Sequence, residues 1–380
     1  MKFSVLLPTH NGEEHLSTCI KSILCQDYDD MELIVYDNAN TDSTQEIIES
    51  FSTDQRLKIY RTEKLVSVTE NWNNALDVSS GDYVLMIGDD DYLLPEYFET
   101  LDQIIKDNDE PDAISYSGYS FVYPGVLDGN ENSYYSEQHF TYENDLINHD
   151  YITGKTLKTI VVDMFKFRNR VPLNTLPQTW SRKLMNKVPG QLFQPPYPDH
   201  FALNSLMLKA NRWVFSNEKL YVLCVTPNSY GSYVFSDNKQ EQAADYLGIS
   251  DKFSELLPGN TLVNNMYVWL QLLKRSYPDE LNDTNISRIN YVKHQIHYWI
   301  SQYKNGTIDR SQLINRFSLL TSRDLASLVS VAWDRRSFTA IVRLLTTKNL
   351  SKIDTFYYRP KPLKNISNAH ELYRNVICKM

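Results

Sequence analysis

The sequence predicts an α/β protein, with a mainly parallel β-sheet flanked by helices and followed by a helical C-terminal region. Through the first 115 residues, short apolar runs typical of buried parallel strands alternate with segments of helical periodicity. From about residue 240, the pattern changes to helical periodicity alone. Because a β-α-β-α-β order places helices on both faces of one parallel sheet, we expect an α/β domain at residues 1–235 and a helical region at residues 236–380.

The expected strands and helices of the first domain are short and follow one another closely. Apolar runs predict the strands, and apolar side chains three or four positions apart predict the helices. The segment 42–44 can cap the second helix, and Pro95 suits the start of a later helix, where its missing N–H costs little. In chain order we expect strand 2–7, helix 13–24, strand 32–36, helix 44–51, strand 57–61, helix 68–78, strand 83–87, helix 95–106 and strand 113–116.

Beyond residue 116 the pattern is less regular. Residues 117–180 are rich in Tyr, Asn and Gly, which predicts loops over one edge of the sheet. Short helices and strands are expected from 181 to 235. The C-terminal region contains three clear helical candidates but no motif that defines its role, so an acceptor, dimer or membrane contact stays open. These candidates are 267–273, 289–303 and 325–345.

Composition and cysteine usage indicate a globular protein of a reducing compartment. Apolar residues make up 42% of the chain and charged residues 22%, which is ordinary for a folded domain. The four cysteines lie far apart, without metal-binding or redox spacing, and are expected to be free thiols. The first apolar run is too short for a signal peptide, and no stretch reaches the roughly 18 apolar residues that span a bilayer. We expect a cytoplasmic protein, soluble or in peripheral contact with the inner face of a membrane.

Charge is distributed unevenly along the chain. Residues 241–380 contain 19 basic and 12 acidic side chains, a balance of +7, whereas residues 1–240 contain 19 basic and 35 acidic ones, a balance of −16. The acidic first part argues against a nucleic-acid partner. The basic second part could face an anionic membrane or acceptor, or could be an ordinary solvated surface.

Three consecutive carboxylates, Asp89, Asp90 and Asp91, directly follow the fourth expected strand. Adjacent acids repel each other, and a hard cation such as Mg²⁺ or Mn²⁺ would relieve this repulsion through oxygen ligands. A solvated acidic turn is the alternative. Polar residues also follow the first two strands, at 9–11 and 37–40. Because ligands bind at the carboxyl ends of parallel strands, the three segments predict one pocket.

Four motifs in order resemble those of the family 2 glycosyltransferases, which have the GT-A fold, a Rossmann-like nucleotide-diphospho-sugar transferase fold. The resemblance covers roughly residues 2–225. It implies a metal-dependent, inverting transfer of a hexosyl or N-acetylhexosaminyl group from a nucleotide-sugar, with a UDP-sugar expected. The acceptor would be a glycan or lipid-linked glycan in cell-surface polysaccharide synthesis. The motifs are SVLLPTHN at 4–11, LIVYDNANTDST at 33–44, NWNNAL at 71–76 and GDDDYLLP at 88–95.

The resemblance implies nucleotide-sugar-binding roles for residues outside the acidic run. Asp37 would accept a hydrogen bond from the uracil N–H, since a carboxylate only accepts; a turn or capping aspartate is the alternative. Lys64 could contact the base or a phosphate, or could be an ordinary surface lysine. The other residues with this implied role are Pro8, Thr9, Asn11 and Asn71.

Counted back from Pro95, the family's acidic motif assigns the metal to Asp90 and its last acid to Asp91, a second possible metal ligand. The family's first acid falls on Gly88, so Asp89 would take over the ribose hydroxyl contact. The cation, Mg²⁺ or Mn²⁺, would neutralise the charge that develops on the leaving nucleoside diphosphate.

An inverting transferase also needs a base for the acceptor hydroxyl. The resemblance places it at Asp199, just ahead of a helical pattern, where a helix N-cap is the alternative. His200 could touch metal or acceptor, or could be structural. Relatives carry a further histidine that reaches the metal, and residues 221–230 have none, so His200, Asn228 or water would substitute. Arginines 168, 170 and 182 could bind phosphate or lie unengaged on the surface.

Two alternatives of other classes remain. A nucleotidyltransferase would normally carry a glycine-rich and basic phosphate loop after the first strand, whereas residues 9–14 contain two acids and no Lys or Arg. A nucleotide- or carbohydrate-binding protein on an inactive scaffold is opposed by the carboxylates at the strand ends. A homo-oligomer is compatible with either class.

Overall fold

The computed structural model describes residues 1–126, 132–138, 151–169, 171, 173–227, 229, 256–304, 306–331 and 361–379. The chain forms two compact units. The first unit comprises residues 1–161, 170–248 and 357–380, and the second comprises residues 162–169 and 249–356. The second unit is therefore inserted between two stretches of the first. The expected domain boundary between residues 235 and 236 lies outside the described residues.

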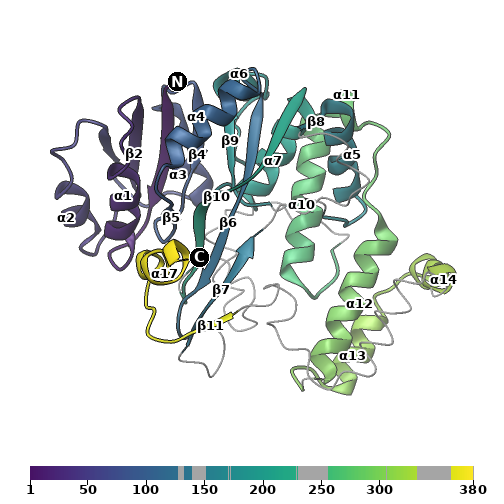
Figure 1. Ribbon diagram of the computed structural model, residues 1–380. Coiled ribbons are helices and arrows are strands. Elements are labelled where there is room, and N and C mark those ends of the chain that lie inside the picture. Colours follow the sequence, from purple (N-terminus) through teal and green to yellow (C-terminus); the bar gives the residue numbers. More distant parts are fainter. Residues whose placement is uncertain are drawn as a thin grey trace. The chain divides into compact units, whose positions relative to one another are not determined.

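The N-terminal half of the sheet in the first unit is parallel, in the order β4-β1-β2-β3. Helices connect these strands, as the alternating sequence pattern predicts (Figure 1). The expected α/β fold class is confirmed. The strands are β1 (Phe3–Thr9), β2 (Met31–Asp37), β3 (Leu57–Arg61) and β4 (Tyr83–Met86), and the helices are α1 (Leu16–Leu24), α2 (Thr44–Glu49), α3 (Val68–Asp77) and α4 (Tyr97–Asp107).

The rest of this sheet is mixed. Strand β9 (Gln178–Ser181) lies between β4 and the long strand β6 and runs antiparallel to both. Strand β6 also pairs in parallel with β10. The strands are β5 (Tyr92–Leu93), β6 (Ala113–Val122), β7 (Ser133–Gln138), β8 (Tyr151–Thr153), β9 (Gln178–Ser181), β10 (Arg212–Val225) and β11 (Lys361–Leu363), and the helices are α5 (Gly154–Met164), α6 (Arg182–Met185), α7 (Pro198–Lys209) and α17 (Ala369–Asn375), followed by the 3₁₀ turn η1 (Ile377–Lys379).

The prediction of loops from 117 to 180 was wrong for most of its described residues. They include the second half of β6, all of β7 and β8, the first three residues of β9, and helix α5. The second half of β6 reads SGYSFV, and every residue of the strand is buried. Because its small polar residues interrupt the apolar run, neither alternation nor a continuous apolar stretch marks it as a strand.

The largest core cluster joins β1, β2 and β4 to helices α1 and α4. Phe3, Leu7 and Leu85 from the strands and Ile20 and Phe98 from the helices are fully buried within it. Burying a side chain of this size contributes about 1.5–3 kcal/mol. These contacts fix the parallel strands, and with them the positions of the polar residues that follow each strand.

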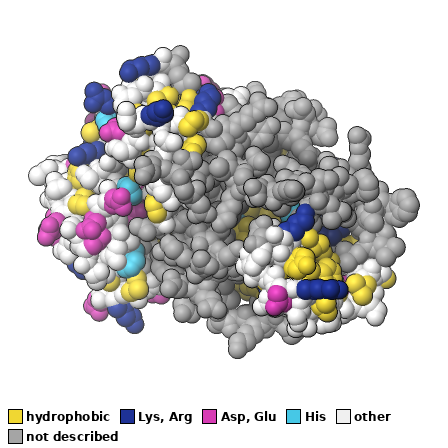
Figure 2. All heavy atoms as spheres, turned by 90° about the horizontal axis from the view of Figure 1, so that it is seen from below, with side chains coloured by type: hydrophobic (Ala, Val, Ile, Leu, Met, Phe, Trp, Pro, Cys, Tyr) yellow, Lys and Arg dark blue, Asp and Glu magenta, His cyan; other side chains and the backbone are white. Residues whose placement is uncertain are grey.

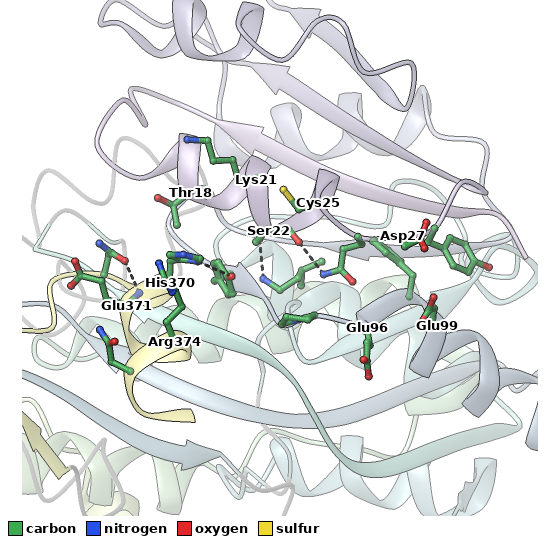
Figure 3. A pocket seen from close by; sticks show the side chains of 18 residues that line it. Thr18, Lys21, Ser22, Cys25, Asp27, Glu96, Glu99, His370, Glu371 and Arg374 are labelled. Atoms are coloured by element: carbon green, nitrogen blue, oxygen red, sulfur yellow. Dashed lines mark hydrogen bonds between the residues drawn. The ribbon is translucent and has the colours of Figure 1, made fainter. Parts of the chain in front are cut away.

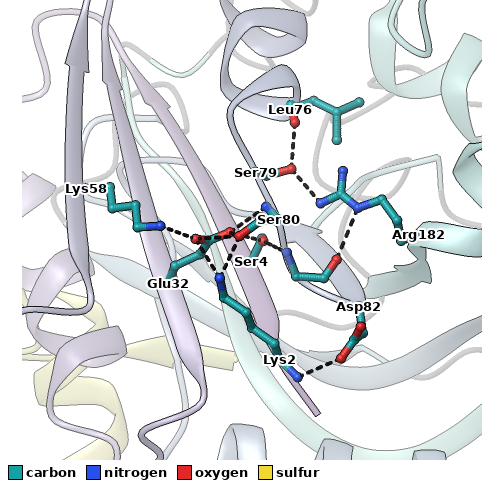
Figure 4. Close-up of polar contacts among 10 residues, drawn as sticks. Lys2, Ser4, Glu32, Lys58, Leu76, Ser79, Ser80, Asp82 and Arg182 are labelled. Atoms are coloured by element: carbon teal, nitrogen blue, oxygen red, sulfur yellow. Dashed lines mark hydrogen bonds and ion pairs between the residues drawn. The ribbon is translucent and has the colours of Figure 1, made fainter.

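A buried carboxylate, Glu32, ties the amino ends of the strands together (Figure 4). It accepts hydrogen bonds from Ser4 Oγ at 2.6 Å, Lys58 Nζ at 2.7 Å and the Ser80 backbone N–H at 2.6 Å, and Lys2 Nζ lies 3.2 Å away. Burial alone would raise the pKa of Glu32. The bonds from Lys58, Ser4 and Ser80 outweigh it and hold the pKa well below its usual range.

Glu32→Gln is expected to lower the free energy of unfolding by about 1.5–3 kcal/mol near neutral pH, because bonds to a charged acceptor become bonds to a neutral one. The lower part of this range is favoured because solvent screens the partly exposed lysines. The lowered pKa stabilises the fold fully above the unfolded value, near 4.5, and this stabilisation fades as the pH falls below it. Urea unfolding at neutral and at acidic pH should show the two proteins converging in acid. Equal midpoints at neutral pH would contradict the role of Glu32.

The second unit is helical. The expected helices 267–273 and 289–303 are confirmed within α10 and α12. Of the expected helix 325–345, residues 325–331 belong to α14, and the other positions lie outside the described residues. Trp299, Tyr291 and Leu257 are among the residues of its core. In the described part of the chain, no helix has both the length and the apolar character that crossing a bilayer requires. The helices are α10 (Thr261–Ser276), α11 (Pro278–Leu281), α12 (Arg288–Lys304), α13 (Arg310–Phe317) and α14 (Ser322–Val331).

Candidate active site

The carboxyl ends of β1, β2 and β4 lie at one edge of the sheet. Thr9, the last residue of β1, is paired in register with Asp37, the last residue of β2. Ile87 extends β4 by donating its N–H to the Leu6 carbonyl, and the acidic run follows two residues later. Thr9 Oγ1 donates to Asp89 Oδ2 at 2.6 Å. The end of β1 therefore meets the acidic run after β4 through a side-chain hydrogen bond and meets the end of β2 through strand pairing, so the three segments lie together as the sequence predicts.

The loop after β2 is organised by its own polar side chains. Asp37 Oδ1 accepts the Asn40 N–H at 2.8 Å, and Arg61 Nε lies 3.6 Å from the other oxygen of Asp37. Ala39 between them has a φ of +52°, an unusual value for a residue with a Cβ. Asp37 is only 2% exposed. Its carboxylate holds the loop in shape at the same edge where the sequence predicts a base contact.

The segment after β1 is joined to this loop. Asn40 Oδ1 accepts the Asn11 N–H, and Asn11 Oδ1 accepts the Thr41 N–H at 3.0 Å. Asn11 has a φ of +55°, which asparagine tolerates better than most residues. The two loops thus form one hydrogen-bonded rim. Pro8 is half-buried and precedes Thr9, the last residue of β1.

Two further predicted residues differ in burial. Asn71 in α3 is buried; its Nδ2 donates to the Tyr36 carbonyl at 3.4 Å, and its Oδ1 has no hydrogen-bond partner among the described residues. A buried amide oxygen without a partner is costly, and it can accept a bond from a ligand. Lys64 is exposed on the segment between β3 and α3. The structure gives Lys64 no contact that separates a phosphate role from that of a surface lysine.

Each acid of the triplet has a different partner. Asp89 accepts from Thr9, and Asp90 Oδ2 accepts from Ser229 Oγ at 2.6 Å. Asp91 Oδ1 accepts the Cys224 N–H at 2.7 Å, and Asp91 Oδ2 accepts the Gly88 N–H at 3.2 Å. Both oxygens of Asp91 therefore already bind backbone groups, which anchors the acidic turn to β10.

The three carboxylates titrate abnormally. Burial, together with the charge of Asp89, raises the pKa of Asp90 to about 7. Burial also raises the pKa of Asp91, with a further contribution from Asp90, and burial raises the pKa of Asp89 against the hydrogen bond from Thr9. The site therefore resists holding three negative charges by itself.

A hard divalent cation fits the donor chemistry of this site but not as a closed protein cage. The triplet offers only oxygen ligands, which Mg²⁺ and Mn²⁺ favour. Among the described residues, no group of three or more His, Cys, Asp or Glu side chains is arranged to hold a metal ion. Such an ion would be held by one or two carboxylates, with Asp90 the least engaged by backbone groups, and would leave coordination positions for a phosphate and water.

Gly88 occupies the position where the family pattern has an acid, and two carboxylates lie close to it in this structure. A Cβ at Gly88 would lie 2.9 Å from Asp91 Oδ2 and 3.0 Å from Asp90 Oδ1. Gly12 is similarly constrained, because its Cβ would lie 2.6 Å from Asp89 Oδ2 and 2.8 Å from Thr9 Oγ1. The sequence analysis did not single out Gly12, although a glycine between a strand-end motif and a helix is a recognisable sign of close packing.

Gly88→Ala is expected to weaken the binding of Mn²⁺ with nucleotide by about tenfold, because the added methyl displaces the Asp90 and Asp91 carboxylates. Overpacking here should also cost about 1–3 kcal/mol of stability. Isothermal titration with Mn²⁺ and UDP measures the affinity, and thermal melts measure the stability. Unchanged values in both measurements would show that the carboxylates are not constrained as described.

Asp199 lies in the first turn of α7, one residue after Pro198, and the N-cap of this helix is Tyr197. The capping alternative for Asp199 therefore does not hold. Burial raises the pKa of Asp199, which suits a group that must accept a proton. Burial lowers the pKa of His200, whose ring centroid lies 5.0 Å from that of Tyr197. Within the described residues, no hydrogen bond or ion pair joins Asp199 to the acidic triplet.

Two side chains near the triplet were not predicted. Ser229, in the stretch where relatives carry a histidine, donates to Asp90. His15, in the turn before α1, packs its ring 4.6 Å from the Tyr123 ring. Burial lowers the pKa of His15, while the charges of Glu14 and Asp89 oppose the shift. The protonation of His15 is therefore coupled to the charge of Asp89 in the acidic run. Asn228 lies outside the described residues.

Of the three arginines considered from the sequence, Arg182 lies in the first unit and away from this edge. Arg182 donates to the Gly81 carbonyl at 3.1 Å and to Ser79 Oγ at 2.7 Å, at the amino end of β4 (Figure 4). That position is opposite the acidic run, so a phosphate contact by Arg182 is excluded in this conformation. Arg168 is exposed in the second unit, and Arg170 lies outside the described residues.

A pocket of about 860 Å³ lies elsewhere on the first unit, between α1, the start of α4 and α17 (Figure 3). Lys21, His370 and Arg374 lie toward one end of it, and Glu96 and Glu99 toward the other. Among the described residues that line it, none belongs to the predicted nucleotide, metal or base positions. The chemistry of the strand ends, rather than the size of a pocket, therefore defines the candidate site.

The sheet and the strand-end site define an α/β protein whose central sheet is mixed, with a parallel N-terminal half. Residues 4–166 match the family model Glycosyl transferase family 2. The chain is 31% identical over 159 residues to the GalNAc(5)-diNAcBac-PP-undecaprenol β-1,3-glucosyltransferase of Campylobacter jejuni, covering 40% of this chain and 48% of that protein. It is 26% identical over 223 residues to glycosyltransferase GlyG of Streptococcus pneumoniae, covering 58% and 69%.

The matched segment thus spans about half of the Campylobacter relative. Among solved structures, S. aureus TarS residues 1–349 in complex with UDP-GlcNAc aligns with 78% of this chain and 81% of that chain. The alignment has 18% identity and a TM-score of 0.47.

Proposed function

We propose that this protein is a metal-dependent, inverting glycosyltransferase that transfers a hexosyl or N-acetylhexosaminyl group from a UDP-sugar to a glycan or lipid-linked glycan. The observation that carries the proposal is the single edge where Thr9, the Asp37 loop and the acidic triplet meet, within the segment that matches the family. The name of the Campylobacter relative, a glucosyltransferase with an undecaprenol-linked substrate, supports a lipid-linked acceptor. We place the reaction in the cytoplasm, in the synthesis of cell-surface polysaccharide.

The donor would bind along the strand ends. The rim formed by Asn11, Asn40 and the Asp37 loop would take the uracil and Asn71 would offer its unpartnered amide oxygen, while Asp89, next to Thr9, would accept a ribose hydroxyl. Asp90 would hold Mg²⁺ or Mn²⁺, with Asp91 or His200 as further candidate ligands. When bound, the cation offsets the negative charge of the leaving diphosphate.

The acceptor hydroxyl needs a base as its oxygen attacks the sugar carbon. Asp199 would take that proton, and burial helps by making its carboxylate more basic than an exposed one. Asp199 can act as a base only when its carboxylate is ionised, and the raised pKa keeps it protonated to a higher pH than an exposed aspartate. The rate should therefore fall as the pH drops through the raised pKa of Asp199.

The test is the release of nucleoside diphosphate from a panel of UDP-, GDP- and dTDP-sugars, with and without Mn²⁺ and with polyprenyl-diphosphate-linked glycans as acceptors. We expect release only from a UDP-sugar, only with a divalent cation, and faster with an acceptor. Release of pyrophosphate from a nucleoside triphosphate would indicate a nucleotidyltransferase. Tight UDP binding without turnover of any donor would indicate a binding protein.

A further inference from the structure

Helices α12 to α14 of the second unit, with the turns between them, expose large apolar side chains. The exposed fractions are 43% for Tyr303, 57% for Ile314, 51% for Leu319 and 48% for Leu325. These are four of the seven exposed large hydrophobic residues in the described part of the chain, and they fall between the end of α12 and the start of α14. Scattered exposed apolar residues are normal, whereas a cluster indicates a contact surface.

Helix α13 has two distinct faces. Leu313 and Phe317, four residues apart, pack against the core of the second unit, where the Phe317 ring lies 5.6 Å from that of Trp299. Arg310 and Ile314, also four residues apart, share an exposed face. No residue of α13 is buried. The inner face of α13 packs on the core of the second unit. The outer face presents a guanidinium and an aliphatic side chain to solvent.

Around α13 and the start of α14, both acids form hydrogen bonds within the unit, and two arginines are exposed. Asp309 forms a capping box with Gln312 at the start of α13. Asp324 is buried, and Arg288 Nε donates to it at 3.2 Å. Arg310 and Arg323 are exposed. Figure 2 shows, on the face seen from below, hydrophobic side chains lying directly beside Lys and Arg side chains.

The second unit as a whole is basic. It contains 16 basic and 10 acidic side chains, a balance of +6, so the first unit has a balance of −15 within the chain total of −9. An anionic partner would be attracted to the second unit and repelled by the first.

We propose that the α13–α14 surface, formed by Tyr303, Arg310, Ile314, Leu319, Arg323 and Leu325, docks on a lipid bilayer that contains anionic headgroups. The aliphatic side chains would enter the boundary between headgroups and acyl chains, and the arginines would bind lipid phosphates. A second copy of the chain fits less well, because a two-fold contact would place each arginine close to like charges. This contact goes beyond the proposed function and does not depend on transferase chemistry.

The experiment is co-sedimentation of the full chain with vesicles of phosphatidylcholine alone or mixed with phosphatidylglycerol. We expect binding to the mixed vesicles, little binding to phosphatidylcholine, and weaker but measurable binding to the mixed vesicles in high salt. The pair Arg310→Gln and Arg323→Gln should weaken binding roughly fivefold per arginine. The pair Ile314→Ser and Leu319→Ser should weaken it by a similar factor in low and high salt, because an apolar contribution is not screened.

Matched controls come from the first unit. Ile59→Ser removes a comparably exposed aliphatic side chain, 42% exposed on β3, and Lys183→Gln removes a cation whose side chain is 83% exposed. Both controls should bind vesicles as the wild type does. The proposal is overturned if the wild type ignores the mixed vesicles, or if the surface variants bind as well as the controls. It is also overturned if sedimentation velocity shows a dimer that Ile314→Ser dissociates.

Discussion

Asp199→Asn is expected to lower kcat for sugar transfer by about 10²- to 10⁴-fold while leaving the affinity for UDP and Mn²⁺ unchanged, because an amide cannot take the acceptor proton. Asp199 lies in the first turn of α7, and burial raises its pKa, so the wild-type rate should decline as the pH falls through that pKa. The variant's residual rate should lack this acidic limb. Initial rates of UDP release across pH, with acceptor at saturation, measure both effects.

The chain offers a matched control for this substitution. Asp279 also follows a proline in the first turn of a helix, α11, but it is exposed. Asp279→Asn removes the same favourable interaction of a carboxylate with a helix N-terminus, worth about 0.3–1 kcal/mol, and should leave kcat unchanged. If both variants kept full turnover, another residue would be the base.

Asp90→Asn is expected to have two opposite effects. With donor and Mn²⁺ present, it should lower kcat/KM by about 10²- to 10³-fold, because the charge that holds the cation against the leaving group is lost. Without metal, it should stabilise the fold above neutral pH. Burial and the charge of Asp89 raise the pKa of Asp90 to about 7, so ionised Asp90 opposes folding.

The sign follows from proton binding. The folded pKa of Asp90 lies above the unfolded value of 3.8, so the wild type loses stability as the pH rises from about 4 to 7. Asn has no such loss. Thermal melts at pH 4 and pH 8 should show the variant gaining on the wild type at the higher pH, and added Mn²⁺ should reverse the order.

Exposed Asp107, on α4, supplies the control for Asp90. Asp107→Asn should change neither the melting temperature with Mn²⁺ nor the turnover. If Asp90→Asn melted below the wild type at pH 8 without metal, Asp90 would stabilise the fold. The melting temperatures would then give no evidence that the Asp90 carboxylate needs a cation to offset its charge.

The parts of the fold and site that could be predicted from the sequence are local. The strands β1 to β4 are short apolar runs, and the polar residues that follow them meet because parallel strands end at a common edge. The mixed part of the sheet could not be predicted in this way. Its strand β6 contains SGYS, and the three-residue strands β8 and β11 are too short to show any periodicity.

The partners of the triplet were beyond the sequence for a related reason. Ser229 lies 139 positions after Asp90, and Cys224 lies 133 positions after Asp91. Nothing in the composition of either segment marks such a contact, because a serine hydroxyl and a backbone N–H are common everywhere. The division of roles within three identical aspartates follows from these long-range hydrogen bonds. The resemblance to a family predicted the site but not its internal support.

The return of the C-terminal segment to the first unit has a consequence for how the protein is made. Strand β11 pairs with β7, Ser133 Oγ donates to the Ile366 carbonyl at 2.8 Å, and His370 Nδ1 lies 3.1 Å from the hydroxyl of Tyr92, the residue after the acidic run. These residues follow the whole inserted helical unit in the sequence and are therefore synthesised after it. The first unit must therefore wait, with one sheet edge unpaired, while the inserted helical unit is free to fold earlier. Products that stop before residue 361 should expose that edge and be prone to aggregation, whereas chains that include β11 cover it.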